Sequence, residues 1–225
     1  MGAQVEPLLG MSDAESDPRY IRVITVALGV FMTEGYEKAT LELIAIQAGV
    51  SKNTIYQFFG CKSDLFKAAV RNIVHERFKD LAEPLDTEQD ITITLTKFAS
   101  KYMQLINCPV YGGCAFYEIP RLVVASAHRE HDSRRFYIDE FYSFCWGTLK
   151  QYFERQMDFG RLPRVDIATC IELFFQLAHG PGFLIFDYDS PDIESIDRKM
   201  KNRVKIFLNA CAILAESENN VSLPL

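Results

Sequence analysis

Two very short helical segments, joined by a turn of only a few residues, constrain the fold of this chain more than any other feature. They lie in the stretch LELIAIQAGVSKNTIYQFFGCK, residues 41–62. The first is expected from Leu41 to about Gln47 with Thr40 as its N-cap, and the second from Lys52 to about Phe58 with Ser51 as its N-cap. A helix of about seven residues is marginal alone in water, so other helices must hold the pair by packing.

The spacing of small and apolar residues in this stretch is that of a helix-turn-helix. Ala45 is small where the two helices would cross, Gly49 suits the left-handed conformation of a tight turn, and Ile55 supplies an apolar plug. The same spacing also fits a plain packing unit of two helices. Spacing alone therefore favours DNA binding only modestly.

The composition of the second short helix favours DNA binding more strongly. Its side chains and N-cap include six hydrogen-bond donors and no acid: Ser51, Lys52, Asn53, Thr54, Tyr56 and Gln57. In a major groove Lys can donate to guanine, Asn or Gln can pair with adenine, and hydroxyl groups can hold phosphates. A merely solvated helix face would usually include Asp or Glu. The segment is therefore interpreted as a recognition helix.

Helix signals on both sides of the pair supply the packing that it needs. Asp17-Pro18 predicts the start of a helix that ends at Gly35, and a further helix is expected from about Lys62 to Leu81. The only clear period-two alternation is ITITLT at residues 91–96, and a single strand would have no partner for pairing. We therefore predict an all-α fold.

The charge is distributed unevenly along a chain whose net charge is −6. Residues 18–80 contain nine Lys and Arg against six Asp and Glu, whereas residues 81–225 contain fifteen against twenty. A mildly basic module on an acidic body is the asymmetry expected when one module meets a polyanion. A chance fluctuation of a few charges explains it about equally well.

Several other classes of protein receive no support from the sequence. No apolar run is long enough for a membrane span, and the first 17 residues lack the features of a signal peptide, so we expect no membrane partner and a cytoplasmic location. No catalytic motif, metal site or cofactor is expected, because the four histidines do not cluster and no C-x-x-C occurs. The closest cysteines, Cys108 and Cys114, leave a redox-responsive regulator as a minor alternative. An enzyme or carrier that reuses the fold is another.

The run from Phe31 to Phe66 resembles the N-terminal DNA-binding domain of the TetR family of bacterial transcriptional regulators. The resemblance covers about residues 18–70 and rests on Phe31, Gly35, Tyr36, Thr40, Ile44, Ala45, Ala48, Gly49, Val50, Ser51, Tyr56, Phe59, Lys62 and Leu65. One position departs from the pattern, because Cys61 stands where the family usually has a Ser or Asn cap. Segments within residues 117–180 resemble, more weakly, the AefR-like type of C-terminal domain.

The resemblance implies roles for residues of the first domain and a division of the chain. Base edges would be faced by Lys52, Asn53 and Gln57, and phosphates would be contacted by Thr40, Thr54, Tyr56 and Lys62, to which the hydroxyl argument adds Ser51. The expected parts are a flexible tail at 1–17, a three-helix helix-turn-helix domain at 18–70, a larger helical ligand-binding and dimerisation domain at 71–217, and a tail at 218–225.

An aromatic cluster in the second domain predicts an apolar ligand pocket. Residues 136–159 hold nine of the 28 aromatic residues on more than one helical face, so this helix is either buried all round or lines a cavity. The predicted pocket residues are Phe98, Tyr102, Phe116, Tyr117, Phe141, Tyr142, Cys145, Trp146, Phe174 and Phe175.

The last helix carries an apolar stripe close to a coiled-coil seam, which could pack inward or against a second copy. With the preceding helix it resembles the surface through which TetR-family subunits pair as a four-helix bundle. The predicted interface residues are Ile171, Phe174, Met200, Val204, Phe207 and Cys211. Together these expectations describe a homodimer on a pseudo-palindromic double-stranded operator, most simply a repressor released by a small apolar or aromatic effector.

Overall fold

The computed structural model describes residues 17–86, 90–107, 118–126, 131–179 and 193–221. Within these ranges all the regular structure is helical, which confirms the all-α prediction. The elements in chain order are α1 (Pro18–Lys38), α2 (Leu41–Ala48), α3 (Lys52–Phe59), α4 (Lys62–Phe78), a 3-10 turn η1 (Glu83–Asp86), α5 (Ile91–Asn107), α6 (Ile119–Ser126), α7 (His131–Asp158), α8 (Ile167–His179) and α9 (Ile193–Val221).

The helix ends follow the predicted stop signals closely, with differences at three places. Gly35 adopts a non-helical conformation (φ 78°, ψ 160°), so regular helix stops there although α1 resumes to Lys38. The fourth helix ends at Phe78 rather than Leu81. The last helix runs to Val221 and so enters the segment 218–225 that was expected to be a tail.

The alternating segment ITITLT forms the first turns of α5, not a strand. Asp90 caps this helix, because its Oδ1 accepts hydrogen bonds from the amides of Thr92 (2.8 Å) and Ile93 (3.2 Å). Burial then follows the helical period, with Thr94 and Leu95 buried and Ile93 exposed. The absence of a partner strand was therefore a sound reason to reject the local pattern.

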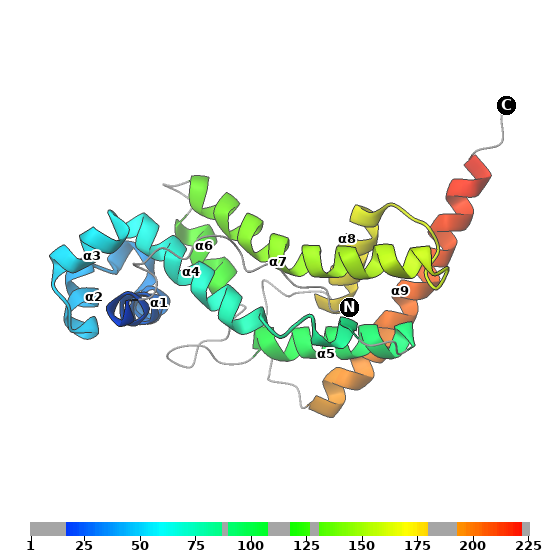
Figure 1. Ribbon diagram of the computed structural model, residues 1–225, viewed down its shortest axis with the longest axis horizontal. Coiled ribbons are helices and arrows are strands. Elements are labelled where there is room, and N and C mark those ends of the chain that lie inside the picture. The colour runs from blue at the N-terminus through cyan, green and yellow to red at the C-terminus, as the bar shows by residue number, and fades with distance from the viewer. Residues whose placement is uncertain (1–16, 87–89, 108–117, 127–130, 180–192, 222–225) are drawn as a thin grey trace.

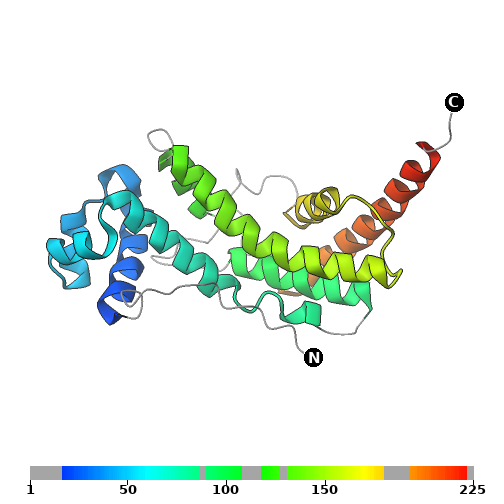
Figure 2. The ribbon, with the colours of Figure 1, turned by 45° about the horizontal axis from the view of Figure 1, so that its top comes forward.

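The molecule is elongated, with α1, α2 and α3 at one end and α5, α8 and α9 at the other (Figure 1). Between them α4 packs against α1 on one side and against α7 on the other, and α5 and α8 both pack against α9. The C-terminal part of α9 extends beyond the helices that cover its first turns, as the second view confirms (Figure 2). Since α4 crosses the expected domain boundary at residue 70, a single helix connects the two expected domains.

One hydrophobic core runs through the described part of the chain, from Val23 near the N-terminal end to Cys211 in α9. Large aromatic rings fill both ends of this core. Among them are Phe31 of α1 and Phe66 of α4 in the first domain, and Phe153 and Phe207 in the second. In the described residues, no helix combines the length and the apolar character that crossing a membrane requires.

Candidate functional site

Side-chain caps fix the starts of the two short helices as predicted. Thr40 Oγ1 accepts a hydrogen bond from the amide of Leu43 (3.1 Å), and Ser51 Oγ accepts one from the amide of Thr54 (3.0 Å). Each bond satisfies an amide that the first turn of a helix leaves without a backbone partner. The two hydroxyl groups therefore hold α2 and α3 in place before any DNA is present.

The turn between α2 and α3 depends on a left-handed glycine. Gly49 has φ 62° and ψ 39°, a conformation that places any other L-residue under strain. The following amide, of Val50, donates to the carbonyl of Ala45 (3.0 Å), which closes the end of α2. The chain can therefore reverse into α3 within three residues.

Packing against α1 and α4 holds α2 and α3 at a fixed angle. Ile44 of α2 and Ile55 of α3 are almost completely buried against α1 and α4. Arg22 of α1 donates through Nε to the carbonyl of Ala48 (2.7 Å), which ties the end of α2 to the first helix. The helix pair is thus a rigid platform, as the short length of its helices required.

The outer face of α3 presents the predicted DNA-contacting residues to solvent. Lys52, Asn53, Tyr56 and Gln57 are exposed, whereas the opposite face of the helix is buried. At the start of the helix, the hydroxyl groups of Ser51 and Thr54 hydrogen-bond to each other (2.8 Å). The structure therefore gathers these side chains on one surface, and their individual contacts with DNA stay predictions.

An acidic residue of the neighbouring helix α2 also lies on this surface. The sequence alone did not predict its presence there. Glu42 of α2 forms an ion pair with Lys52, whose Nζ also lies 5.8 Å from the centre of the Tyr56 ring. Hydrogen bonding to Lys52 lowers the pKa of the Glu42 carboxyl and raises the pKa of the lysine. Glu42 lies ten residues before its partner, so only the crossing angle of the two helices brings them together.

Lys62, at the start of α4, is held against the C-terminal end of α1. Its Nζ donates to the carbonyl of Glu37 (3.2 Å) and lies 4.6 Å from the centre of the Tyr36 ring. The side chain is half-buried, so it stabilises the fold as well as carrying charge. A phosphate that Lys62 contacts would have to share the ammonium group with these partners.

Cys61 occupies the N-cap of α4 and makes no capping hydrogen bond, as expected from a residue that caps poorly. Its thiol instead donates to Oδ2 of Asp64 (3.0 Å) in the first turn. Asp64 lies where a carboxylate favours the helix dipole. The helix therefore begins at Lys62 without the side-chain cap that is usual in the family.

Four of the predicted pocket residues pack closely against one another, and the pocket itself stays a prediction. Phe98, Tyr102, Phe174 and Phe175 are buried and contact one another, with ring centres 5.9 Å apart for Phe98 and Phe174 and 5.3 Å for Tyr102 and Phe175. Trp146 is half-buried. Phe116 and Tyr117, and the side chains of Phe141, Tyr142 and Cys145, lie outside what is described.

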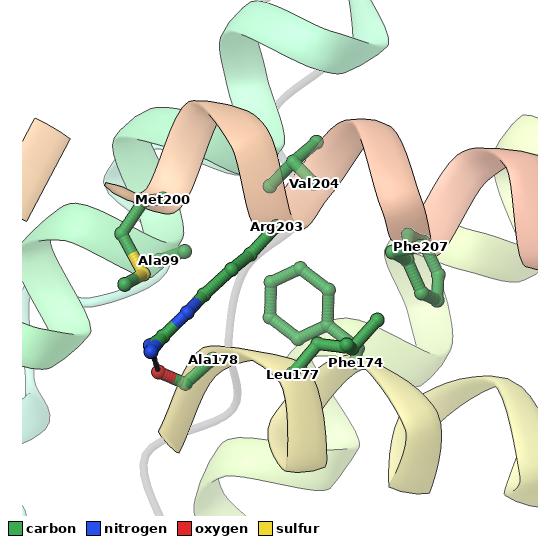
Figure 3. A pocket seen from close by; sticks show the side chains of 8 residues that line it. All are labelled: Ala99, Phe174, Leu177, Ala178, Met200, Arg203, Val204 and Phe207. Atoms are coloured by element: carbon green, nitrogen blue, oxygen red, sulfur yellow. Dashed lines mark hydrogen bonds between the residues drawn. The ribbon is translucent and has the colours of Figure 1, made fainter. Parts of the chain in front are cut away.

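A small cavity of about 10 Å³ lies between α5, α8 and α9, next to these rings (Figure 3). That is room for roughly one water molecule. Among the described residues, Phe174 is the one predicted pocket residue that lines it. The described lining is Ala99, Phe174, Leu177, Ala178, Met200, Arg203, Val204 and Phe207. A ligand of ordinary size could enter this region only if the helices moved apart.

Polar groups lie beside the cavity at the end of α8. The Tyr102 hydroxyl hydrogen-bonds to Nε2 of His179, and Arg203 donates to the carbonyl of Ala178 (2.8 Å; Figure 3). Burial, helped by the positive charge of Arg203, lowers the pKa of His179 to about 4. The imidazole is therefore neutral at physiological pH and serves as a buried hydrogen-bonding partner.

The predicted interface residues lie inside a single chain. Each of the six is at most 2% exposed: Ile171, Phe174, Met200, Val204, Phe207 and Cys211. The stripe on α9 therefore faces α5 and α8, which corrects the assignment of these side chains to a contact between subunits. Among the described side chains of α9, the exposed large apolar ones are Ile206 (55%) and Ile213 (66%), on another face of the helix.

The structure does not test the redox alternative in the form that the sequence suggested. Cys108 and Cys114 both lie outside the described residues, so the redox hypothesis based on them stays a prediction. Among the residues that are described, no group of three or more His, Cys, Asp or Glu side chains could hold a metal ion.

Comparisons with known proteins agree with this geometry. Residues 23–69 match the model for bacterial regulatory proteins of the TetR family, and residues 93–212 match the model for the AefR-like transcriptional repressor C-terminal domain. The chain is 21% identical over 197 residues to an uncharacterised helix-turn-helix transcriptional regulator, YfiR, of Bacillus subtilis, covering 86% of this chain and 94% of that protein.

Solved structures show the same architecture. A putative TetR-family regulator from Mesorhizobium loti superposes with a TM-score of 0.76 at 19% identity, over 88% of this chain and 98% of that one. The regulator FadR from Bacillus subtilis, solved with stearoyl-CoA, gives 0.64 at 17% identity, over 84% and 97%. With a helix-turn-helix of this geometry and family models that match both parts of the chain, the protein belongs to the TetR family of transcriptional regulators and has an AefR-like C-terminal domain.

Proposed function

We propose that this regulator is a dimeric repressor that binds a pseudo-palindromic operator and is released by a largely apolar small-molecule effector. One observation carries the proposal: a row of exposed donors on α3 sits on a rigid platform, and a single helix, α4, joins that platform to an aromatic core. The first part supplies DNA recognition. The second supplies a physical route from a ligand to the DNA-binding surface.

On DNA, the exposed face of α3 would lie in the major groove. Lys52, Asn53 and Gln57 would read base edges, while hydroxyl and ammonium groups around them hold phosphates: Thr40, Ser51, Thr54, Tyr56 and Lys62. Lys52 would exchange its ion pair with Glu42 for a base or phosphate oxygen. Glu42 therefore opposes non-specific binding, since its carboxylate is repelled by phosphates.

Two subunits would pair through the outer faces of α8 and α9. Ile206, Ala210 and Ile213 are spaced by four and three residues, so they share one face of α9, which differs from the face that packs inward. Two isoleucines more than half exposed on one helix face are the kind of apolar surface that subunit contacts bury. The dimer would place its two α3 helices about 34 to 36 Å apart.

Ring contacts link the far end of α4 to the aromatic core. Phe78, the last residue of α4, lies 5.9 Å from Tyr102 of α5 in a stacked pair, and Tyr102 in turn contacts Phe175 of α8 edge to face. A ligand that separated these rings would have to displace the end of α4. Since α4 also packs against α1 and α3, the DNA-binding platform would move with it.

The effector would open a core that is closed in the described structure. Because the space beside Phe174 is about 10 Å³, a bound ligand favours a different arrangement of α5, α8 and α9. A long apolar chain is the ligand class we infer, and stearoyl-CoA in the similar fold of FadR supports it. Effector and operator then oppose each other reciprocally, typically by about 1 to 3 kcal/mol.

The experiment begins with selection of operator sites from a random double-stranded library by the full-length protein. We expect a pseudo-palindrome with half-sites in successive major grooves, and a monomer on one asymmetric site would contradict the proposal. Ile206→Glu together with Ile213→Glu should yield monomers that bind weakly, while Lys150→Glu, at an exposed position of α7, is the control for charge.

Operator affinity is then measured by fluorescence anisotropy with and without stearoyl-CoA, with free coenzyme A as the matched control. Binding to the protein is followed independently through the fluorescence of Trp146, the only tryptophan. We expect stearoyl-CoA to change the fluorescence of Trp146, by quenching or enhancement, and to weaken operator binding. A ligand that binds near Trp146 and leaves operator affinity unchanged would refute the coupling, and one that tightens binding would indicate a co-repressor.

Base reading is tested separately. Asn53→Ala or Gln57→Ala should relax the preference at particular base pairs at a cost of about 1 to 3 kcal/mol each. Gln151→Ala, an exposed glutamine on α7, is the control and should leave the selected site unchanged. Equal losses on specific and random DNA would show that these two side chains do not read bases.

A further inference from the structure

Two cysteines from different helices lie side by side in the core of the second domain. Cys170 of α8 and Cys211 of α9 have their sulfur atoms 4.0 Å apart, although they are 41 residues apart in the sequence. Both side chains are fully buried. They are distinct from Cys108 and Cys114, the pair on which the redox hypothesis from the sequence rested.

The two thiols are chemically unequal. The hydrogen bond that the Cys170 and Cys211 thiols share, together with burial, raises the pKa of Cys170. The same hydrogen bond lowers the pKa of Cys211, because it stabilises the thiolate of that residue. Since the thiolate is the nucleophile in thiol chemistry, Cys211 is the more reactive member of the pair and Cys170 is placed to react second.

We propose that Cys170 and Cys211 form an oxidation site, at which hydrogen peroxide converts the two thiols into an intrachain disulfide that joins α8 to α9. The Cys211 thiolate attacks one peroxide oxygen and the O–O bond breaks, which gives a sulfenic acid and, after protonation, one water. The Cys170 sulfur then attacks the Cys211 sulfur. The S–S bond forms, the sulfenic hydroxyl leaves as a second water, and the two thiols have lost two electrons to the peroxide.

The positions of the two sulfur atoms allow this reaction without a large rearrangement of the fold. A disulfide requires an S–S distance of about 2.05 Å, so the two sulfur atoms must approach by about 2 Å, within reach of side-chain rotation and a small shift of the helices. Peroxide is small and uncharged, and it needs only a local opening of the contact between α8 and α9. The product would join two helices across a long loop, which constrains the unfolded chain more than the folded one.

The test uses the full-length protein and maps its thiols after graded hydrogen peroxide. Remaining thiols are blocked under denaturing conditions, the protein is digested without reduction, and linked peptides are identified by mass spectrometry. We expect a linked peptide that contains Cys170 and Cys211, a melting temperature raised by roughly 5 to 15 °C, and reversal of both by dithiothreitol. Recovery of both residues as free thiols at doses that oxidise the exposed Cys61 would overturn the proposal.

Single variants test the assigned roles. In Cys170→Ala, oxidation should stop at a sulfenic acid on Cys211, which dimedone traps, whereas in Cys211→Ala the Cys170 thiol should stay reduced at the same dose. Cys61→Ala is the matched control and should still form the bond. If the linked peptide appears only in urea-unfolded protein, the folded chain does not contain the site; mapping of the unmodified sequence decides this even if a variant fails to fold.

Discussion

Replacing Lys62 with methionine separates the two roles that the structure gives this residue. The methionine keeps an apolar stem beside Tyr36 but removes the ammonium group, which lies 4.6 Å from the ring centre and donates to the carbonyl of Glu37. A partly buried cation over a ring and one hydrogen bond from a charged donor together contribute about 1 to 2 kcal/mol. Urea unfolding should therefore show a loss of that size.

The DNA-binding consequence is calculated from counterion release. Each phosphate contact contributes about 0.9 to the slope of log affinity against log salt concentration, so losing Lys62 from both subunits of a dimer lowers the slope by about 1.8. Consequently, the ratio between the operator affinity of the unmodified protein and that of the variant should shrink by about tenfold between 50 and 200 mM salt. Fluorescence anisotropy with operator and with random DNA measures both slopes.

Two controls make this result decisive. Lys62→Arg retains the charge and should keep the slope. Lys150→Met removes one charge at an exposed position of α7 and should change neither slope nor stability appreciably. If Lys62→Met lost affinity equally at every salt concentration, the lysine would act only through its packing on Tyr36. An unchanged affinity and slope would refute the phosphate contact altogether.

Four further predictions concern single residues. Gly49→Ala should cost about 1 kcal/mol in urea unfolding, through its left-handed backbone alone, because an added Cβ meets nothing within 4 Å. Glu42→Gln should tighten binding to specific and random DNA in titrations and barely affect folding, since its ion pair with Lys52 is exposed. Phe207→Ala, which removes a fully buried ring, should destabilise the fold by about 3 to 5 kcal/mol in the same unfolding assay. The pKa of His179 is lowered to about 4 in the folded protein, so as the pH falls this imidazole is protonated in the unfolded chain before it is protonated in the folded one. The free energy of unfolding should therefore fall by roughly 3 kcal/mol between about pH 6.5 and pH 4. A His179→Gln variant should not show this loss.

The sequence by itself determined the DNA-binding platform. The caps at Thr40 and Ser51, the left-handed Gly49 and the inward-facing Ile55 are local signals, because each acts within about one turn of helix. It also determined the all-α class, since the alternation at residues 91–96 had no partner strand. The exposed face of α3 followed from the same local periodicity.

Tertiary structure alone decided how remote segments meet. The stripe on α9 has the same spacing whether it packs inward or against another subunit, and only the positions of α5 and α8 bury Phe207 and leave Ile206 exposed. The contacts of Glu42 with Lys52 and of Cys170 with Cys211 join residues from different helices. Local backbone preferences are set within a few residues, whereas such contacts depend on the crossing angles and spacing of whole helices, which the packing of the complete core determines.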